Sequence, residues 1–261
     1  MFICDVKTES FQESVPSEYA DLSPAVIQIS ENPILFSVLS DGAKKKIEML
    51  EDLLLHDIGK RGVRNIYIKE DLQKSALRLS QASTVGITTG FPCFPDDPVK
   101  EETDGIPGAI SIAKALCALG KEVSFIVEGR NIKLLNAIIE RSVELGILEK
   151  TVPVLEYDRD RRSQPEQAAV PFLYPDGIEG KPRFEHLVAI ERTSPAKDGT
   201  YRNMRGEPLP EKIISPMEDL FKQGNTITEM IWGCIGHTKE NQSGKKQRKP
   251  TQLLNNIDLI I

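Results

Sequence analysis

Three carboxylates lie within four residues in the segment EETDGIPGA, residues 101–109. Glu101, Glu102 and Asp104 precede a glycine and a proline, after which the apolar pattern is typical of a helix. A further acid, Glu191, directly follows the apolar run HLVAI. Carboxylate oxygens are the ligands that Mg²⁺ and Mn²⁺ prefer, and a carboxylate can also accept a proton during catalysis. Glu102, Asp104 and Glu191 are therefore candidate metal ligands and catalytic groups.

A helix N-terminus by itself could explain part of this acidic cluster. Asp104 would cap the helix, while Glu101 and Glu102 would each gain about 0.3–1 kcal/mol from its positive end. Capping leaves the Gly- and Pro-rich loop TTGFPCFPDDPVK, which precedes the cluster, unexplained. This loop is not a phosphate-binding loop, because it lacks a GK[ST] ending. The residues alone leave both capping and metal chemistry open.

A second polar loop, AIERTSPAKDGTYRNMRGE (residues 189–207), contains Glu191 near its start. Asn203 and Arg205 lie in its turn-rich second half. Glu191 could pair with Arg192 or Arg205 at the surface, which would be a purely structural role. The alternative is that these polar side chains surround a substrate.

The elements that would position the two loops follow an alternating order. β-branched and apolar runs predict strands at residues 83–90, 122–129, 151–157 and 186–192. Helical spacing, with Asn131 as a cap and Gly59 or Gly62, Gly120 and Gly146 as stops, predicts helices at residues 41–62, 70–82, 106–121, 131–146 and 210–224. Strands that alternate with helices of this length indicate a three-layer α/β sandwich with a mostly parallel sheet.

This fold class brings the two acidic loops to one place. Ligands of an open α/β sheet bind at the carboxyl ends of the strands, and parallel strands have these ends at the same edge. We therefore expect Glu102, Asp104 and Glu191 to converge in a site made of oxygen ligands, suited to Mg²⁺ or Mn²⁺.

Composition excludes several classes of protein. The 261 residues carry a net charge of −6, which argues against a nucleic-acid-binding protein. No apolar run reaches the roughly 18 residues that a membrane-spanning helix needs. The four cysteines are widely spaced, which favours a reducing compartment over a zinc site or a disulfide framework. The first 22 residues are acidic, unlike a transit peptide, so no cellular address is recognisable.

Three segments break the alternating pattern. Residues 1–34 are polar and are expected to precede the α/β domain, which we place at residues 35–224. Residues 159–183 are polar and rich in Pro and Gly, which predicts a long loop over the sheet edge. Residues 225–261 include a basic stretch and are expected to form a poorly ordered tail.

Several of these motifs together resemble the D-glutamate cyclase family. TTGFP, ETDGIPGAISIAKAL, LGKEVSFIVEG and HLVAIERTSPAKDGTYRNMRG occur in the order and spacing of the C-terminal domain of its vertebrate mitochondrial members. The resemblance covers roughly residues 35–222. The combination of ETDG-PGA with AIER…DG-Y-NMRG is more specific than either motif alone.

The resemblance implies a lyase that converts D-glutamate to 5-oxo-D-proline and water, assisted by a divalent metal. Glu102, Asp104 and Glu191 would then bind the metal or transfer protons. The substrate would be bound by a further set of polar groups at the strand ends: Thr89, Gly90, Arg192, Asn203 and Arg205.

The chain also departs from the family pattern. Family members continue into a strand and a loop of the type GIGDGGNE, whereas this chain reads NTITEMIWGCIGHTKENQSGKKQRKP. We therefore expect a shortened or alternative form, such as a product of alternative splicing. The alternative function is a catalytically silent form that binds a metal or an acidic metabolite. For the cellular location, the resemblance implies the mitochondrial matrix, whereas the lack of a recognisable transit peptide favours the cytoplasm. The sequence indicates no oligomeric state.

Overall fold

The computed structural model describes residues 39–60, 62–65, 67–92, 96, 100–160, 163–178, 180–196, 198–203, 206–227 and 231–235. The predicted polar segment at residues 1–34 lies outside the described residues. The chain divides into two compact units, residues 1–39 and 40–261, and the elements described below all belong to the second.

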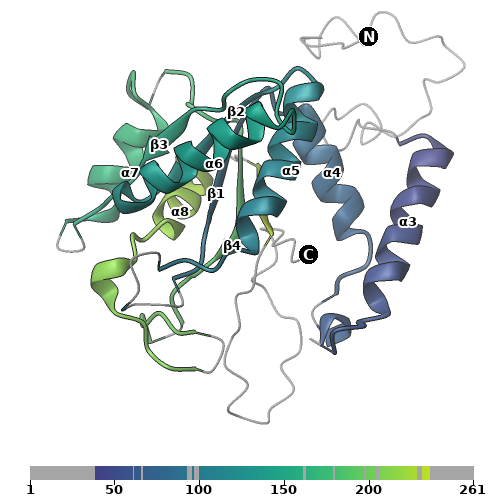
Figure 1. Ribbon diagram of the computed structural model, residues 1–261, viewed down its shortest axis with the longest axis horizontal. Helices are drawn as coiled ribbons and strands as arrows, with labels where there is room; N and C mark the ends of the chain where they lie inside the picture. Colours follow the sequence, from purple (N-terminus) through teal and green to yellow (C-terminus); the bar gives the residue numbers. More distant parts are fainter. Residues whose placement is uncertain are drawn as a thin grey trace, which may run out of the picture. The chain divides into compact units, whose positions relative to one another are not determined.

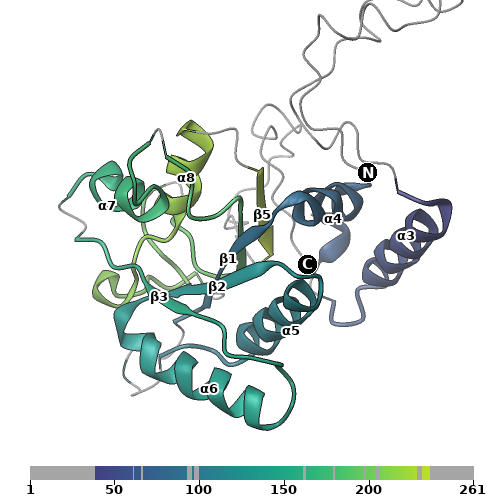
Figure 2. The same cartoon turned by 90° about the horizontal axis from the view of Figure 1, so that it is seen from above.

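The centre of this unit is a five-stranded sheet in which all neighbouring strands run parallel. Its strands lie in the order β3-β2-β1-β4-β5; Figure 1 labels the first four of them and Figure 2 labels β5. The bounds are β1 Thr84–Gly90, β2 Glu122–Val127, β3 Val154–Glu156, β4 His186–Arg192 and β5 Ile231–Ile235. The central strand β1 pairs with β2 on one side and β4 on the other. The strands β2 and β3 therefore extend the sheet on one side of β1, and β4 and β5 extend it on the other, which makes β1 the point where the strand order reverses.

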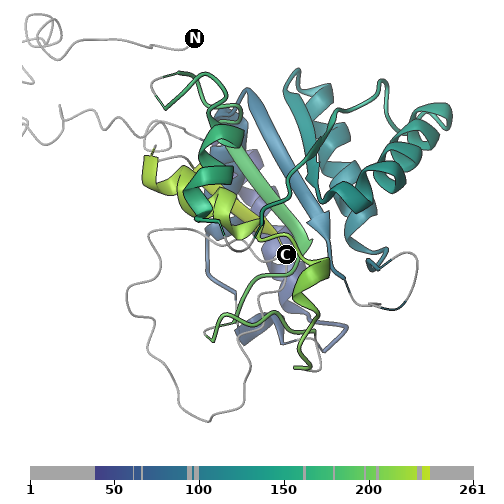
Figure 3. The ribbon, with the colours of Figure 1, turned by 90° about the vertical axis from the view of Figure 1, so that its left-hand side faces the viewer.

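Helices cover both faces of the sheet, which confirms the predicted three-layer α/β sandwich (Figure 3). One face carries α5 (Gly105–Ala118) and α6 (Ile132–Glu144), and the other carries α7 (Pro165–Leu173) and α8 (Glu218–Ile227). Near the β5 edge, α4 (Asp71–Gln81) contacts α3 (Asp41–Leu55) (Figure 2). Short 3₁₀ turns occur at Val63–Asn65, Gly129–Asn131 and Glu211–Ile213.

The strands divide their side chains between the two faces with a period of two. Val85 and Ile87 of β1 contribute to the core under α5 and α6. Between them, Gly86 faces α7 and α8, where a Cβ would lie 2.5 Å from Leu187 Cδ2 and 2.8 Å from Ile126 Cδ1. Glycine at this position therefore lets large neighbouring side chains fill the second core.

Glycines end two of the helices as predicted. Gly120 (φ +76°) and Gly146 (φ +67°) adopt the left-handed conformation directly after the C-caps of α5 and α6. Asn131 occupies the predicted N-cap position of α6, but its side chain makes no capping bond and donates to Glu128 instead. The N-cap position was thus predictable, whereas the contact of its side chain was not.

Four elements differ from the sequence-based expectation. The helix predicted at residues 41–62 ends at Leu55, before either candidate glycine. The supposed loop at residues 159–183 contains α7, which begins with Pro165 at a position that suits the fixed φ of proline. The helix predicted at residues 210–224 begins only at Glu218, because Pro216 disfavours helical backbone in the residue before it.

The fourth difference lies in the C-terminal segment. Residues 231–235 form β5, which pairs with β4 over five residues. This strand corrects the expectation that the whole of residues 225–261 forms an irregular tail, and the basic stretch after it lies outside the described residues. Among the helices that the structure describes, none is both long and apolar enough to span a bilayer.

Candidate active site

The carboxyl end of β4 contains an irregularity that reorients Glu191. Thr89 of β1 pairs with Ile190, but the next residue, Gly90, pairs with Arg192, so Glu191 is an extra residue in β4. Glu191 has φ +46°, a left-handed conformation that residues other than glycine rarely adopt. Strained residues of this kind cluster at functional sites, because the surrounding structure must hold them in place.

The N-terminus of α5 lies directly against this irregular residue. A Cβ on Gly105, the first residue of α5, would lie 2.6 Å from Glu191 Cβ and 2.8 Å from Thr89 Oγ1. No real Cβ tolerates such distances, so this close approach requires glycine. Gly105 therefore brings the residue before it, Asp104, close to the end of β4.

Glu102, Asp104 and Glu191 converge as the strand order predicted. Each offers one carboxylate oxygen, and the three oxygens lie within 4.8 Å of one another. Two oxygens that bind one ion at 2.0–2.6 Å can lie up to about 4–5 Å apart, so this spacing fits a shared divalent cation. Three hard oxygen donors suit Mg²⁺, Mn²⁺ or Ca²⁺. We refer to these three residues as the acidic triad.

Helix capping accounts for one member of the triad. Asp104 is the N-cap of α5 and accepts a hydrogen bond from the Gly105 backbone N–H at 3.0 Å. Capping does not account for Glu191, which comes from a different strand and a sequence position far from the helix. The structure thus supports the capping interpretation for Asp104. It also brings the three carboxylates together, which capping cannot explain.

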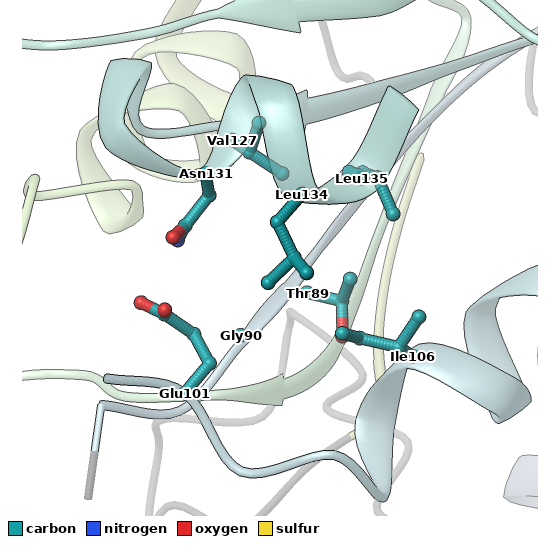
Figure 4. Close-up of a pocket in the computed structure, with 8 residues that line it drawn as sticks. All are labelled: Thr89, Gly90, Glu101, Ile106, Val127, Asn131, Leu134 and Leu135. Atoms are coloured by element: carbon teal, nitrogen blue, oxygen red, sulfur yellow. The ribbon is translucent and has the colours of Figure 1, made fainter. Parts of the chain in front are cut away.

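A small pocket opens beside the triad, between the end of β1 and helices α5 and α6 (Figure 4). The space in and in front of it, open solvent included, is about 250 Å³, and the part enclosed by the lining side chains has room for little more than a water molecule. Its lining is Thr89, Gly90, Glu101, Ile106, Val127, Asn131, Leu134 and Leu135. Both predicted strand-end residues, Thr89 and Gly90, therefore contribute to it.

Thr89 links the pocket to the triad. It lines the pocket, and it also lies against Gly105 at the triad. Its side chain is buried, and within the described part of the chain its Oγ1 has no hydrogen-bond partner. A buried hydroxyl without a partner is costly, which makes this oxygen a candidate to bind a ligand after neighbouring side chains move to expose it.

A second group of charged side chains lies at the same sheet edge and is fully buried. Glu128, directly after β2, is 2% exposed, and Arg192 is 5% exposed. Both terminal nitrogens of Arg192 donate to the Glu128 carboxylate, one of them at 2.9 Å to Oε2. Burial would raise the pKa of Glu128, but the Arg192 charge outweighs this effect and holds the pKa below its ordinary value.

Arg192 also binds backbone groups on both sides of the ion pair. Its Nη1 donates to the Gly90 carbonyl at 3.2 Å, and its Nη2 donates to the Ser215 carbonyl at 3.1 Å. Glu128 Oε1 in turn accepts from the Ser215 backbone N–H at 3.3 Å. The sequence predicts Arg192 as a ligand for a substrate carboxylate, whereas the structure shows its guanidinium bound to Glu128.

Glu101 forms a further ion pair at this edge, with Arg130, whose side chain is 27% exposed and which also lies 3.8 Å from Glu128 Oε1. Glu101 is 4% exposed and accepts from Arg130, which also donates to the Ile213 carbonyl. Across the pocket mouth, the Glu101 carboxylate and the Asn131 amide face each other (Figure 4). Glu128 and Arg130 were not predicted as site residues, and Asn131 was predicted only as a helix cap. All three follow the strand at residues 122–127, and the rule that ligands bind at the carboxyl ends of parallel strands would have identified them.

The remaining predicted substrate residues lie in the loop after β4. The Asn203 side chain donates to Glu207 Oε2 at 2.7 Å and accepts from the Glu207 backbone N–H at 3.0 Å, which closes a turn. Arg205 lies outside the described residues, so its role stays a prediction.

Comparison with known proteins connects this site to a family. The family model for the C-terminal domain of D-glutamate cyclase-like proteins matches residues 50–241. The chain belongs to this family. Over 204 residues it is also 41% identical to the human protein "D-glutamate cyclase, mitochondrial"; the matched region is 78% of this chain and 32% of the human protein. The chain thus spans about a third of the length of that relative.

The D-glutamate cyclase-like match contains the whole candidate site. It extends from within α3 to beyond β5, so all five strands and both acidic loops lie inside it. The family assignment and the geometry of the acidic triad therefore concern the same part of the molecule.

Proposed function

We propose that this chain is a D-glutamate cyclase that converts D-glutamate to 5-oxo-D-proline and water, with a divalent metal bound by the acidic triad. The family assignment and the name of the human relative support the substrate and the reaction. The observation that carries the proposal is the convergence of Glu102, Asp104 and Glu191 from two loops at one edge of the sheet. Since Glu191 reaches the triad only through a strained conformation, the arrangement suggests a functional constraint.

The reaction closes a ring within one molecule. The α-amino nitrogen of D-glutamate forms a bond to the γ-carboxyl carbon, and one γ-oxygen leaves as water. The nitrogen must lose one proton before it can attack and a second as the amide forms, and the departing oxygen must gain both to leave as water. The site therefore has to accept a proton near the amine, donate a proton near the γ-oxygen, and reduce the negative charge of the γ-carboxylate.

The acidic triad supplies the groups for these tasks. A carboxylate within hydrogen-bond reach of the amine can accept its proton and later return it to the leaving oxygen. Glu102 and Glu191 are partly buried and Asp104 is exposed, so all three combine some contact with water and access to a ligand. A divalent cation held by these residues would supply positive charge to neutralise the γ-carboxylate.

The pocket beside the triad would position the substrate. The unpartnered Thr89 hydroxyl and the backbone of Gly90 can bind polar substrate atoms, and the apolar walls from α5 and α6 exclude water. Because Arg192 is engaged by Glu128, we assign binding of a substrate carboxylate to Arg205 and retain Asn203 as a further candidate.

The test is turnover of D-glutamate by the purified chain with Mn²⁺ or Mg²⁺, with 5-oxoproline measured by chromatography. We expect product with metal and a loss of activity in Asp104→Asn, which preserves size but removes the charge. Glu140→Gln is the matched control, because Glu140 is an exposed carboxylate on α6. Turnover that persists in Asp104→Asn would contradict the role of the triad.

The same experiment separates the cyclase from the catalytically silent alternative. Binding of Mn²⁺ or D-glutamate without any 5-oxoproline would favour the silent form, and absence of both binding and turnover would contradict both functions. We further propose a mitochondrial matrix location: the name of the human relative supports the mitochondrion, and the matrix rests on the family resemblance alone. Imaging of a fluorescent fusion against a matrix marker tests it, and a diffuse cytoplasmic signal would contradict it.

A further inference from the structure

We propose that the buried Arg192–Glu128 ion pair is a positioning device that holds Glu191 in the conformation required for metal binding. This inference rests on the proposed metal site, and it assigns a role in that site to two residues that do not themselves belong to the triad.

Arg192 anchors the chain directly after the strained residue. It directly follows Glu191, and it is the residue at which pairing with β1 resumes after the irregularity. Its side chain reinforces this pairing, because Nη1 donates to the carbonyl of Gly90, the residue with which Arg192 pairs. Glu191 is thus confined between Ile190, which is held by the sheet, and Arg192, which is held by both the sheet and its own side chain.

The ion pair also joins several chain segments. Arg192 comes from β4, the Gly90 carbonyl from β1, and Glu128 from the end of β2. The backbone at Ser215 binds both partners, since its carbonyl accepts from Arg192 and its N–H donates to Glu128. Three adjacent strand ends and the segment before α8 are therefore fixed relative to one another at this point.

Stability alone does not explain why the fold buries these two charges. Burial of two charges carries a large desolvation penalty, and apolar side chains of similar volume often give equal or greater stability. A pair that is 2% and 5% exposed is therefore poorly explained by stability alone. The two terminal nitrogens of a guanidinium can together bind one carboxylate, and each can also donate to a backbone carbonyl. These directional hydrogen bonds fix the orientation of the joined segments, which an apolar contact does not do.

The consequence for Glu191 follows from its contacts. The strained residue lies against Gly105, with 2.6 Å between its Cβ and an ideal Cβ position on that glycine, so it has no room to shift toward α5. If Arg192 lost its anchor, the irregular backbone could relax away from α5 and return to regular pairing. Glu191 would then leave the triad, although no metal ligand had been altered.

The experiment replaces the pair while keeping its volume. The double variant Glu128→Leu/Arg192→Met is compared with wild type in the full chain, by titration calorimetry with MnCl₂ and by the electron paramagnetic resonance spectrum of bound Mn²⁺. We expect a fold that unfolds cooperatively, with Mn²⁺ affinity reduced about 10–100-fold, the usual effect of removing a group that orients a metal ligand. The Mn²⁺ spectrum should also change, which a purely structural role would not produce.

A matched control uses another buried ion pair. Arg159 and Asp219 are paired at 2.6 Å, with side chains 10% and 4% exposed, and neither belongs to the triad. Arg159→Met/Asp219→Leu should retain wild-type Mn²⁺ affinity. Should the first double variant fail to fold, Arg192→Lys serves in its place, because it keeps the charge but lacks the fork, and the same loss of affinity is expected.

The outcomes separate this inference from the function on which it rests. Wild-type Mn²⁺ affinity in a folded Glu128/Arg192 variant overturns the inference and leaves the metal site intact. An equal loss of affinity in the Arg159/Asp219 control also overturns it, because the effect would then be general destabilisation. Failure of the wild-type chain to bind Mn²⁺ contradicts the metal site itself, and the inference with it.

Discussion

The carboxyl edge of the sheet presents its acidic residues in two different ways. On the side of α5 and α6, Glu102, Asp104 and Glu191 bring three carboxylates within 4.8 Å, at positions that are partly buried or exposed. At the end of β2, Glu128 is buried and neutralised by Arg192. Residues of the same chemical type, at the same edge, thus either carry their own counter-charge or gather like charges together.

The difference shows which carboxylates are scaffold and which are available to a ligand. Two like charges about 5 Å apart repel by about 1 kcal/mol in water and about 3 kcal/mol at an effective dielectric constant of about 20. In the part of the chain that the structure describes, Glu102 and Asp104 form no ion pair with a basic side chain. A cation from solution would relieve this repulsion, whereas Glu128 has no need of one.

The largest expected effect tests the buried half of this comparison. Arg192→Ala leaves the Glu128 carboxylate buried without its counter-charge, which should reduce the free energy of unfolding by about 3–5 kcal/mol. Glu102→Ala, at the triad, should leave the free energy of unfolding unchanged or slightly increase it in the presence of EDTA, because it removes repulsion. Urea denaturation of both variants measures the contrast. Equal destabilisation by the two substitutions would show that the triad is also part of the scaffold.

The second prediction tests the triad half. A cation that binds only the folded chain stabilises it by about 2.7 kcal/mol at 100 times its Kd, so Mn²⁺ should raise the Tm and EDTA should reverse the shift. Asp104→Asn should abolish the shift, whereas Glu140→Gln should preserve it. Differential scanning fluorimetry with increasing MnCl₂ checks this. A Tm that rises equally in Asp104→Asn would mean that Mn²⁺ binds somewhere other than the triad.

The third prediction tests the close approach that creates the triad. Gly105→Ala would place a Cβ 2.6 Å from Glu191 Cβ, and relief of this overlap should cost about 1–3 kcal/mol and weaken Mn²⁺ binding. Gly108→Ala in the same helix is the matched control, because its Cβ would meet nothing closer than Ile190 Cγ2 at 3.7 Å. We expect Gly108→Ala to leave Mn²⁺ affinity unchanged and to stabilise α5 by about 0.5–1 kcal/mol. Identical behaviour of the two variants would contradict the packing argument.

The convergence of the triad could be predicted from the sequence because it depends mainly on topology. Once the strands at residues 84–90 and 186–192 are known to be parallel, the loops after them must share an edge, which places Asp104 and Glu191 together. The glycine stops at Gly120 and Gly146 were equally predictable, since a left-handed helix end favours glycine.

The parts that the sequence did not predict depend on contacts between distant residues. No local pattern marks Glu191 as an extra residue in its strand, because the irregularity exists only relative to β1. The pairing of Arg192 with Glu128, 64 residues earlier, is likewise invisible to periodicity. Helix α7 was missed for a different reason: its polar and Pro-rich surroundings masked a short apolar face that is stabilised by packing against α8.

The smallest expected effect concerns His186, a buried imidazole that the fold keeps uncharged instead of pairing it with a carboxylate. His186 begins β4 at the opposite edge of the sheet, is 3% exposed, and burial together with the nearby Arg78 and Lys121 charges lowers its pKa to about 4. Between this value and the ordinary pKa of about 6.5, the unfolded chain binds a proton that the native chain does not, so stability falls as the pH falls. From pH 7 to pH 5.5, this linkage should remove about 1 kcal/mol. His186→Gln should flatten that part of the pH dependence in urea denaturation, whatever its effect at pH 7. An unchanged slope would mean that the imidazole gains its proton in the folded state, and that both edges of the sheet tolerate a buried positive charge.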